Sequence, residues 1–537
     1  MYKRVIALFS ILMTCICILI FNIYNISQGE WLSQAANSQN TYRLDIARLR
    51  GEIYDCRKNK LVETEQKSVA AVVPCIESKT ELVKKLSNTK RESILTLCSS
   101  IEPFAINLTE DNISAKGIDI FKVPIRYSDS QLCQHIIGYI DSSGKGICGI
   151  EKAYNDYLSK TGAKISVKYD VDALGRLLEG KEREIDDKSY LQTKGIVLTI
   201  DSRIQKIVEK EASKNLDCGA VVITEVPSCK IRACASFPGY SVYDIEKALN
   251  DERSPFLNRA IESYNVGSVF KLLTSAVAME AGVSNDYSFE CCGSIHVEDA
   301  KFNCFNGVGH EKVDMKDAIA YSCNSYFVDI SKNIEPAKFL DKCKELGFGQ
   351  SIELAPGYFS DCGNLPTEKQ LKNPKTMANF SFGQGPLLAT PIQISGLINA
   401  IASKGVYNEP SLVEGLVNEN LDFVEKKERP QAKRVMSEQI ANFLCESMKS
   451  AVEYGTSTKG KPENLTAAAK TATAETGLEK NGEMVEQAWY CGFYPADNPK
   501  YSIVVFMEDG KSGSNCGPTF KEIADSIYNQ IPGSLID

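Results

Sequence analysis

Residues 264–279 read YNVGSVFKLLTSAVAM, which places a serine and a lysine three positions apart at the start of an apolar run. Residues three apart lie on the same face of a helix, so Ser268 and Lys271 are expected to be neighbours. The apolar residues from Leu272 onward predict a buried helix. Burial disfavours the charged form of a lysine, whose ordinary pKa is about 10.4, and a neutral amine can take the proton of a serine hydroxyl. The pair therefore indicates acyl transfer through Ser268.

The Ser-x-x-Lys spacing alone is weak evidence, because it also occurs at Ser87–Lys90 and Ser142–Lys145. The sequence around the helix adds a fold. Short apolar runs and amphipathic segments predict strands and helices on both sides of it, at 195–201, 202–215, 218–226, 229–237, 466–475, 487–495, 501–508 and 519–531. Strands at both ends with helices between them predict an α+β domain, in which one antiparallel sheet is covered by a helical block.

The segment 133–162, CQHIIGYIDSSGKGICGIEKAYNDYLSKTG, is expected to form a strand, a glycine-rich turn and an amphipathic helix. It belongs to a mixed, rather polar region. We therefore expect a tip and transmembrane anchor at 1–27, a pedestal or dimerisation-type domain at 28–190, and the catalytic domain at 191–537.

The anchor is predicted from twenty mostly apolar residues, Val5–Tyr24, which follow Lys3 and Arg4. At ~1.5 Å per residue such a helix spans roughly 30 Å, the thickness of a bilayer core. A cleaved signal peptide is the alternative, but the run is long for one and no small-x-small cleavage site follows it. The preceding basic residues predict a single-pass protein whose remainder lies outside the cytoplasm.

Charge and composition exclude several classes of protein. A net charge of −8 without a basic arm argues against nucleic acid as a partner. The three histidines, His135, His296 and His310, are too far apart for an HExxH-type zinc site, so neither a metal nor another cofactor is expected. The nineteen cysteines show no regular spacing, and we expect most of them to be free and buried.

Three short motifs in a fixed order resemble those of class B penicillin-binding proteins, which are membrane-anchored D,D-transpeptidases of bacterial wall synthesis. They are NRAIESYNVGSVFK (258–271), YSCNSYF (321–327) and KTAT (470–473). Further blocks of the family are FGQGPLLATPIQ (382–393), VEYGTST (452–458), AWYCGFYP (488–495), RGEIYD (50–55) and GICGIEKAYNDYL (146–158). The resemblance covers nearly the whole chain.

The resemblance implies a role for each motif residue. Ser268 would attack the carbonyl of the penultimate D-alanine of a wall stem peptide, and Lys271 would take its proton. Ser322 would relay a proton to the departing D-alanine, while Asn324 would hold Lys271 and the substrate. The backbone N–H groups of Ser268 and Thr473 would form the oxyanion hole.

Strand geometry adds detail to the third motif. Alternation places Thr471 and Thr473 on one face, where they can bind the terminal carboxylate of the substrate. Lys470 lies on the other face with Ala472, where its charge supports the same anion site and can reach Ser322. The family has glycine at the position of Ala472 and proline at that of Val266, so the tolerance of the site for Ala472 is open.

Cys323 lies between Ser322 and Asn324 and has two interpretations. The first is a small buried side chain. The second is a disulfide with another cysteine, such as Cys304, that switches the enzyme off.

Alternative functions remain open at this point. The three motifs do not distinguish a transpeptidase from a D,D-carboxypeptidase, because both form the same acyl-enzyme. A β-lactamase or β-lactam sensor fits the length and the anchor poorly, and a catalytically impaired scaffold in a division or sporulation complex is supported only by Ala472. The resemblance also implies β-lactams as ligands and a membrane-embedded glycan polymerase as partner.

Overall fold

The computed structural model of the 537-residue chain describes residues 2–28, 40–85, 95–108, 113–172, 177–178, 183–186, 194–480, 482–531, 533 and 535. The chain divides into two compact units. The first unit comprises residues 1–50, 63–126 and 162–193, and the second comprises 51–62, 127–161 and 194–537. Two segments that lie inside the expected pedestal range therefore belong to the second unit, and the expected boundaries at 27 and 190 stay a prediction.

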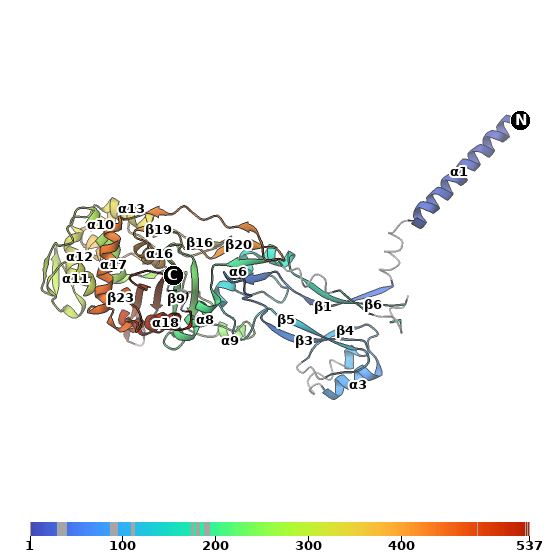
Figure 1. The fold of residues 1–537 in the computed structure, drawn as a ribbon, viewed down its shortest axis with the longest axis horizontal. Helices are drawn as coiled ribbons and strands as arrows, with labels where there is room; N and C mark the ends of the chain where they lie inside the picture. The colour runs from blue at the N-terminus through green and yellow to red at the C-terminus, as the bar shows by residue number, and fades with distance from the viewer. Residues whose placement is uncertain are drawn as a thin grey trace. The chain divides into compact units, whose positions relative to one another are not determined.

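The second unit is built on a five-stranded antiparallel sheet in the order β10-β9-β25-β24-β23 (Figure 1). Its strands are β9 (Gly219–Glu225), β10 (Ile231–Phe237), β23 (Ala468–Lys480), β24 (Glu483–Tyr494) and β25 (Tyr501–Met507). Two strands come from the start of the catalytic region and three from its end. The expected sheet, assembled from both ends of the domain, is thus confirmed.

Each face of this sheet packs against helices because alternate side chains of each strand point to opposite faces. Val221 and Val505 pack in the core beneath α8 (Ser202–Ala212) and α18 (Gly517–Gln530), which lie side by side in Figure 1. Val222 and Val504 belong to the other core. That core holds the helical block of α10 (Lys271–Glu280), α11 (Met315–Ala320), α12 (Asn324–Ser331), α13 (Pro336–Glu345), α16 (Pro391–Ala402) and α17 (Glu438–Glu453).

The second unit also contains a four-stranded sheet, β2-β8-β20-β21, and several two-stranded sheets. Its strands are β2 (Glu52–Tyr54), β8 (Gly195–Leu198), β20 (Val413–Val417) and β21 (Phe423–Lys426). Strand β2 pairs in parallel with β8. It lies between β1 and β3 of the first unit in the sequence, yet it belongs to a sheet of the second unit.

One element was predicted wrongly. The strand expected at the start of segment 133–162 is a short helix, α5 (Gln134–Ile137), because both of its isoleucines are fully buried against the core of the second unit. The glycine-rich turn follows as expected. The helix after it is broken at Tyr154 into α6 (Gly149–Ala153) and α7 (Asn155–Lys160).

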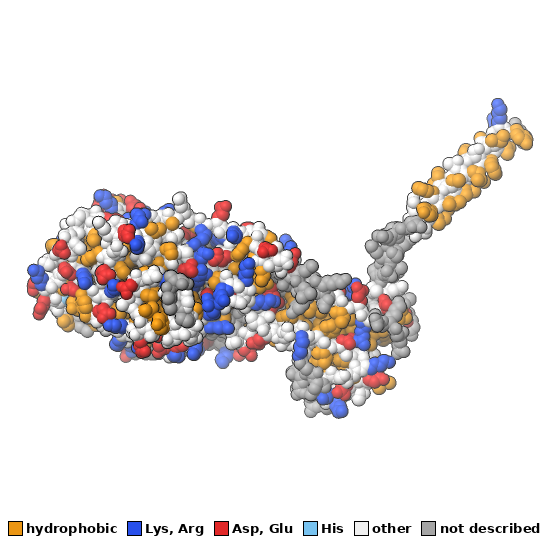
Figure 2. Space-filling model, viewed as in Figure 1, with side chains coloured by type: hydrophobic (Ala, Val, Ile, Leu, Met, Phe, Trp, Pro, Cys, Tyr) orange, Lys and Arg blue, Asp and Glu red, His pale blue; other side chains and the backbone are white. Residues whose placement is uncertain are grey.

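The first unit contains two three-stranded sheets with the orders β1-β6-β7 and β4-β3-β5. Their strands are β1 (Thr41–Arg48), β3 (Glu65–Val72), β4 (Phe104–Leu108), β5 (Ile118–Ile125), β6 (Lys164–Asp170) and β7 (Glu184–Asp186). The helices of this unit include α3 (Ile76–Lys85) and α1 (Tyr2–Gln28). Helix α1 is long and apolar enough to cross a membrane, and Figure 2 shows hydrophobic side chains along it with basic ones at its tip.

Candidate active site

Ser268 of the first motif lies on a tight turn of 3₁₀-helix, Gly267–Phe270, which leads directly into α10. Gly267 has a φ of +63° and packs on β23, where a Cβ would lie 2.9 Å from the carbonyl oxygen of Thr473. Only glycine accepts both this conformation and this close approach. The tight turn at Gly267 therefore places Ser268 next to β23, and the buried helix α10 follows directly.

Lys271 is fully buried and contacts four oxygen atoms. Its Nζ lies 3.0 Å from Ser268 Oγ, 2.6 Å from Asn324 Oδ1, and 2.8 and 3.0 Å from the carbonyl and hydroxyl oxygens of Ser322. An ammonium group has three protons and a neutral amine has two, so the four contacts cannot all be donated bonds at once. The amine therefore links both serines and the asparagine. The contact with Ser268 was expected from helical spacing, and the contact with Asn324 from the family resemblance.

The environment of Lys271 favours a neutral amine. All four oxygens around it are uncharged, and loss of hydration on burial lowers the pKa of Lys271 to about 7. A base with this pKa is neutral in a substantial fraction of molecules near pH 7, and it lies within hydrogen-bonding distance of the Ser268 hydroxyl.

The second motif lies on the turn between α11 and α12. Ser322 adopts a φ of +61°, and the N–H of Cys323 donates to the carbonyl oxygen of Ala318 (2.9 Å), which closes the end of α11. A serine in the left-handed region is strained, and such strain is often found at functional sites. Asn324 begins α12, and its amide Nδ2 donates to the carbonyl oxygen of Asn303 (2.9 Å).

The third motif lies on β23, beside the turn that carries Ser268. Thr471 and Thr473 line the same cleft as Ser268, Ser322 and Asn324, a cleft of about 1270 Å³. Lys470 is fully buried, and its Nζ donates to the carbonyl oxygen of Thr471 (2.8 Å). Burial, and then the nearby charge of Lys271, hold the pKa of Lys470 well below its ordinary value. The contact of Lys470 with Ser322 stays a prediction.

Two residues of the cleft were missed from the sequence. The hydroxyl of Thr471 donates to Thr456 Oγ1 (2.7 Å), and the N–H of Gly513 donates to Thr473 Oγ1 (3.1 Å). Thr456 lies within the family block 452–458, for which no residue roles were predicted. Gly513 lies in a polar loop that contains no recognisable motif. Both contacts fix hydroxyl groups of the third motif.

The methyl group of Ala472 is accommodated. Its residue is 2% exposed, and on one side its Cβ faces Gly267, where a built Cβ would lie 3.3 Å away. On the other side Gly513 crosses its backbone so closely that a Cβ there would lie 2.4 Å from the Ala472 carbonyl oxygen. Two glycines thus supply the space around this position. Val266, the other departure from the expected motif, is fully buried.

Comparison with known proteins assigns the family. The model of the penicillin binding protein transpeptidase domain matches residues 219–525, more than half of the chain. The chain belongs to the penicillin-binding protein transpeptidase family. The family predicted from three short motifs is therefore confirmed.

The relatives of this penicillin-binding transpeptidase align over most of its length. Stage V sporulation protein D of Bacillus subtilis is 26% identical over 91% of this chain and 79% of its own. A structure described as structural coordination of polymerization and crosslinking by a peptidoglycan synthase complex has a TM-score of 0.72 at 22% identity, and covers 98% of each chain. Penicillin-binding protein 2 of Helicobacter pylori, in complex with MreC, has a TM-score of 0.66 at 21% identity over 91% of this chain and 99% of that one. These relatives support the class B-like organisation.

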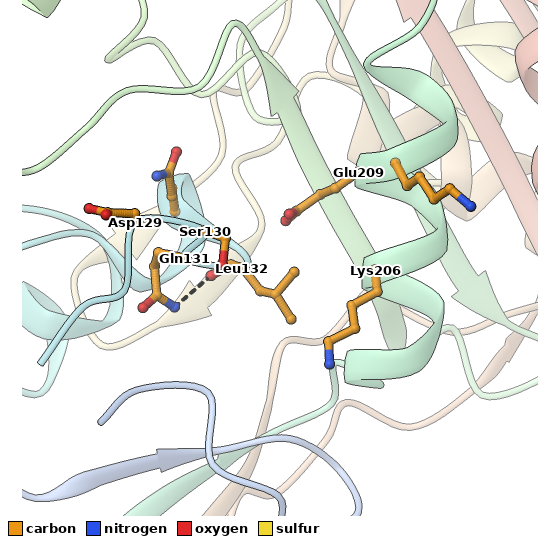
Figure 3. A pocket seen from close by; sticks show the side chains of 8 residues that line it. Asp129, Ser130, Gln131, Leu132, Lys206 and Glu209 are labelled. Carbon is orange, nitrogen blue, oxygen red and sulfur yellow. Dashed lines mark hydrogen bonds between the residues drawn. The ribbon is translucent and has the colours of Figure 1, made fainter. Parts of the chain in front are cut away.

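A second, smaller pocket of this penicillin-binding transpeptidase lies away from the three motifs. About 370 Å³ in volume, it lies between residues 129–134 and α8, and Figure 3 shows Glu209 extending from the helix toward that segment. Glu209 accepts a hydrogen bond from the N–H of Cys133 (2.8 Å), and burial raises its pKa. The contact fastens the segment around α5 to the sheet-covering helix.

The cysteines of this penicillin-binding transpeptidase are all free within the described residues. Cys323 is fully buried, and its Sγ lies 3.8 Å from that of Cys304. The two residues suggested as a disulfide pair are thus neighbours without a bond between them.

Proposed function

We propose that the protein is a serine-type peptidoglycan D,D-transpeptidase that cross-links wall stem peptides through an acyl-enzyme on Ser268. The observation that carries the proposal is the buried amine of Lys271, 3.0 Å from Ser268 Oγ and with a pKa of about 7. A serine hydroxyl needs such a base, and the family to which the chain belongs has transpeptidase activity as its described function.

In the acylation step, Ser268 Oγ attacks the carbonyl carbon of the penultimate D-alanine while Lys271 Nζ takes the hydroxyl proton. The bond from that carbon to the terminal D-alanine nitrogen then breaks. Ser322 Oγ, 3.0 Å from Lys271 Nζ, passes a proton to the departing amine and receives the one held by the lysine. The products are an ester on Ser268 and free D-alanine.

In the second step, the amine of another stem peptide attacks the ester. Its proton returns through Lys271 to Ser268 Oγ as the ester bond breaks, so the serine is regenerated and a new amide links the two peptides. Asn324 keeps Lys271 aimed at both serines through its 2.6 Å contact.

Charge that develops on the substrate is met by the third motif. We assign the backbone N–H groups of Ser268 and Thr473 to the oxyanion hole, where one donor can contribute a factor of ~10² or more. Thr471 and Thr473 would bind the substrate carboxylate from the wall of the cleft, and Lys470 would support this anion site from behind that wall. β-Lactams, which present a similar carboxylate and a reactive carbonyl, would acylate the same serine.

We place the catalytic unit outside the cytoplasm, held to the bacterial membrane by α1. Among the described residues, α1 is the one helix long and apolar enough to cross a membrane, and the basic residues at its start support this placement. A solved relative described as coordinating polymerization and crosslinking in a peptidoglycan synthase complex supports a membrane-embedded glycan polymerase as partner. The similarity to stage V sporulation protein D supports proteins of division or sporulation as further partners.

Two other activities share the same site. A D,D-carboxypeptidase would use water instead of an amine in the second step. A scaffold would keep the fold without acylation. The buried amine of Lys271 argues against a scaffold, because an apolar side chain such as methionine would stabilise this position better if the protein needed only its fold.

Labelling of the full-length protein with a fluorescent penicillin tests the proposal. Wild type should be labelled covalently, and Ser268→Ala should not. Ser142→Ala, which removes the serine of an exposed Ser-x-x-Lys sequence, is the matched control and should be labelled like wild type. Labelling of Ser268→Ala would refute the assignment. Supplying an amine acceptor with a labelled stem peptide then distinguishes cross-linked product from the shortened peptide of a carboxypeptidase.

A further inference from the structure

Four potential metal ligands meet beside the second motif. The side-chain atoms of Cys291, Cys304, His310 and Cys323 all lie within 4.8 Å of one another. The three cysteines are buried and the histidine is half-buried. All four come from the second unit and from one region of the helical block.

The distances between the four atoms fit a tetrahedral metal centre. Zinc–sulfur bonds of about 2.3 Å in a tetrahedron place the sulfur atoms about 3.8 Å apart, and a sulfur and an imidazole nitrogen about 3.6 Å apart. The observed separations are 3.6 Å for Cys291–Cys304, 3.8 Å for Cys304–Cys323 and 3.5 Å for Cys291 Sγ to His310 Nδ1. A disulfide requires about 2.05 Å between its sulfurs, so the arrangement is that of ligands around a common point rather than that of bonded pairs.

We propose that Cys291, Cys304, His310 and Cys323 bind a structural zinc ion. Three thiolates and one imidazole in tetrahedral array favour Zn²⁺ over Mg²⁺ or Ca²⁺, which prefer oxygen ligands. Four protein ligands also close the coordination sphere, so no position is left for a catalytic water. Binding releases the protons of those thiols that were protonated.

The backbone around the cluster is shaped to present these ligands. Cys291 ends β12 (Phe289–Cys291), and its carbonyl accepts from the N–H of His310 (3.0 Å), just before β15 (Glu311–Val313). The N–H of Cys304 donates to the carbonyl oxygen of Gly293 (2.9 Å), which folds the hairpin of β13 (Ser294–Val297) and β14 (Ala300–Asn303) back onto the same point. The ligands are thus held by hydrogen bonds independent of any metal.

The cluster also offers a favourable setting for thiolates. Cys323 is the N-cap residue of α12, and a helix N-terminus stabilises negative charge. Ser325 Oγ lies 3.3 Å from Cys304 Sγ and can donate a hydrogen bond to it, as the second shell of a metal site commonly does.

The position of the site gives it a role in the reaction. Cys323 is joined directly to Ser322 and Asn324, while Cys304 follows Asn303, whose carbonyl accepts from Asn324. A metal bound by Cys304 and Cys323 therefore fixes both anchors of the turn that holds Lys271. We infer that the zinc ion is a positioning element for the second motif and not part of the chemistry.

Metal content of the full-length protein, purified in detergent with zinc in the growth medium and without chelator, tests the proposal. Elemental mass spectrometry should find about one zinc per chain in wild type. Cys304→Ser should lose most of it, and Cys292→Ser, which changes the exposed neighbour of a ligand, should retain it. His310→Cys, which restores a four-ligand set, should keep the metal that His310→Ala loses.

A second readout is independent of folding yield and activity. Cobalt(II) added to the metal-free wild type should produce the thiolate-to-cobalt charge transfer and the visible bands of a tetrahedral site. Metal-free wild type that takes up neither zinc nor cobalt would overturn the proposal, as would Cys304→Ser with undiminished zinc. Peptide mapping that finds Cys304 and Cys323 joined in a disulfide in the native protein would also overturn it. None of these results depends on whether Ser268 is acylated, so they do not bear on the proposed transpeptidase.

Discussion

The turn of Ser322, Cys323 and Asn324 has two sides that differ in chemistry. On one side, Ser322 and Asn324 surround the amine of Lys271 with uncharged oxygens. On the other, Cys323 joins two thiols and an imidazole. The first side keeps a buried amine neutral and ready to accept a proton, whereas the second gathers ligands suited to a cation. The comparison teaches that three consecutive residues can face two chemical environments, because the side chains of Ser322 and Asn324 approach Lys271 while that of Cys323 approaches Cys304.

Removal of the Lys271 amine should have the largest effect on the rate of Ser268 acylation. Lys271→Gln retains a polar side chain but no base, so acylation of Ser268 by a fluorescent penicillin should slow by about 10²–10⁴-fold. Lys271→Arg should fail as well, because arginine stays protonated. Stopped-time gel fluorescence measures the rate. A Lys271→Gln rate within threefold of wild type would contradict its role as base.

A negative charge placed beside Lys271 tests whether the uncharged oxygens around the amine set its pKa. In wild type the neutral fraction of Lys271 rises with pH, so the acylation rate should rise through about pH 7. Asn324→Asp places an anion next to the amine, which stabilises its protonated form and raises its pKa. The midpoint should move to higher pH, and the rate at pH 7 should fall by roughly tenfold or more.

The control is Asn324→Ala, which removes the same contact without adding charge and should not move the midpoint upward. Rate profiles from pH 5 to 10, taken on folded protein as judged by circular dichroism, provide the measurement. Identical midpoints for wild type and Asn324→Asp would exclude Lys271 as the titrating group.

Removal of the metal proposed at the cysteine cluster should have a smaller effect on the acylation rate. Removal of the proposed zinc with a chelator should lower the acylation rate by about tenfold, because small displacements of catalytic groups are costly. Re-addition of zinc should restore the rate. Cys304→Ser, already without metal, should not respond to either treatment, and a chelator response equal to that of wild type would show that the effect arises elsewhere.

The smallest effect is expected at Ala472. Ala472→Gly removes a methyl group that is already accommodated, so the acylation rate should change by less than about threefold, while glycine in a strand costs roughly 0.5–1 kcal/mol of stability. Ala468→Gly, in the same strand and also buried, should lose similar stability without touching Gly267. A large gain in acylation for Ala472→Gly alone would mean that the methyl does displace the catalytic turn.

The sheet of the second unit was predictable because its strands and helices carry strong local patterns. The continuous apolar run around Val221 and Val222 indicates a strand buried on both faces, and the amphipathic pattern around Ile204 and Ile207 indicates a helix. The segment at 133–140 was not, because a short apolar run does not distinguish a strand from a buried helix.

The candidate site likewise contains residues whose placement was predictable from local sequence patterns and residues whose placement was not. Ser268 and Lys271 are related by helical spacing, and Thr471 and Thr473 by strand alternation, so their placement follows from local geometry. The four-residue cluster depends on how two small hairpins pair between residues 289 and 313. That register carries no local signal, and the sequence suggested only Cys304 and Cys323 as partners.

The interleaving of the two units along the chain has a consequence for folding. The chain passes between them five times, at residues 50/51, 62/63, 126/127, 161/162 and 193/194. Strand β2 is synthesised early, yet its partner β8 begins only at Gly195. During synthesis, the N-terminal segments of the second unit, 51–62 and 127–161, therefore stay without their partners in that unit until residues from 194 onward have been made. A fragment cut at residue 191 would contain every catalytic motif but lack β2, leaving β8 with an open edge of the kind that promotes aggregation.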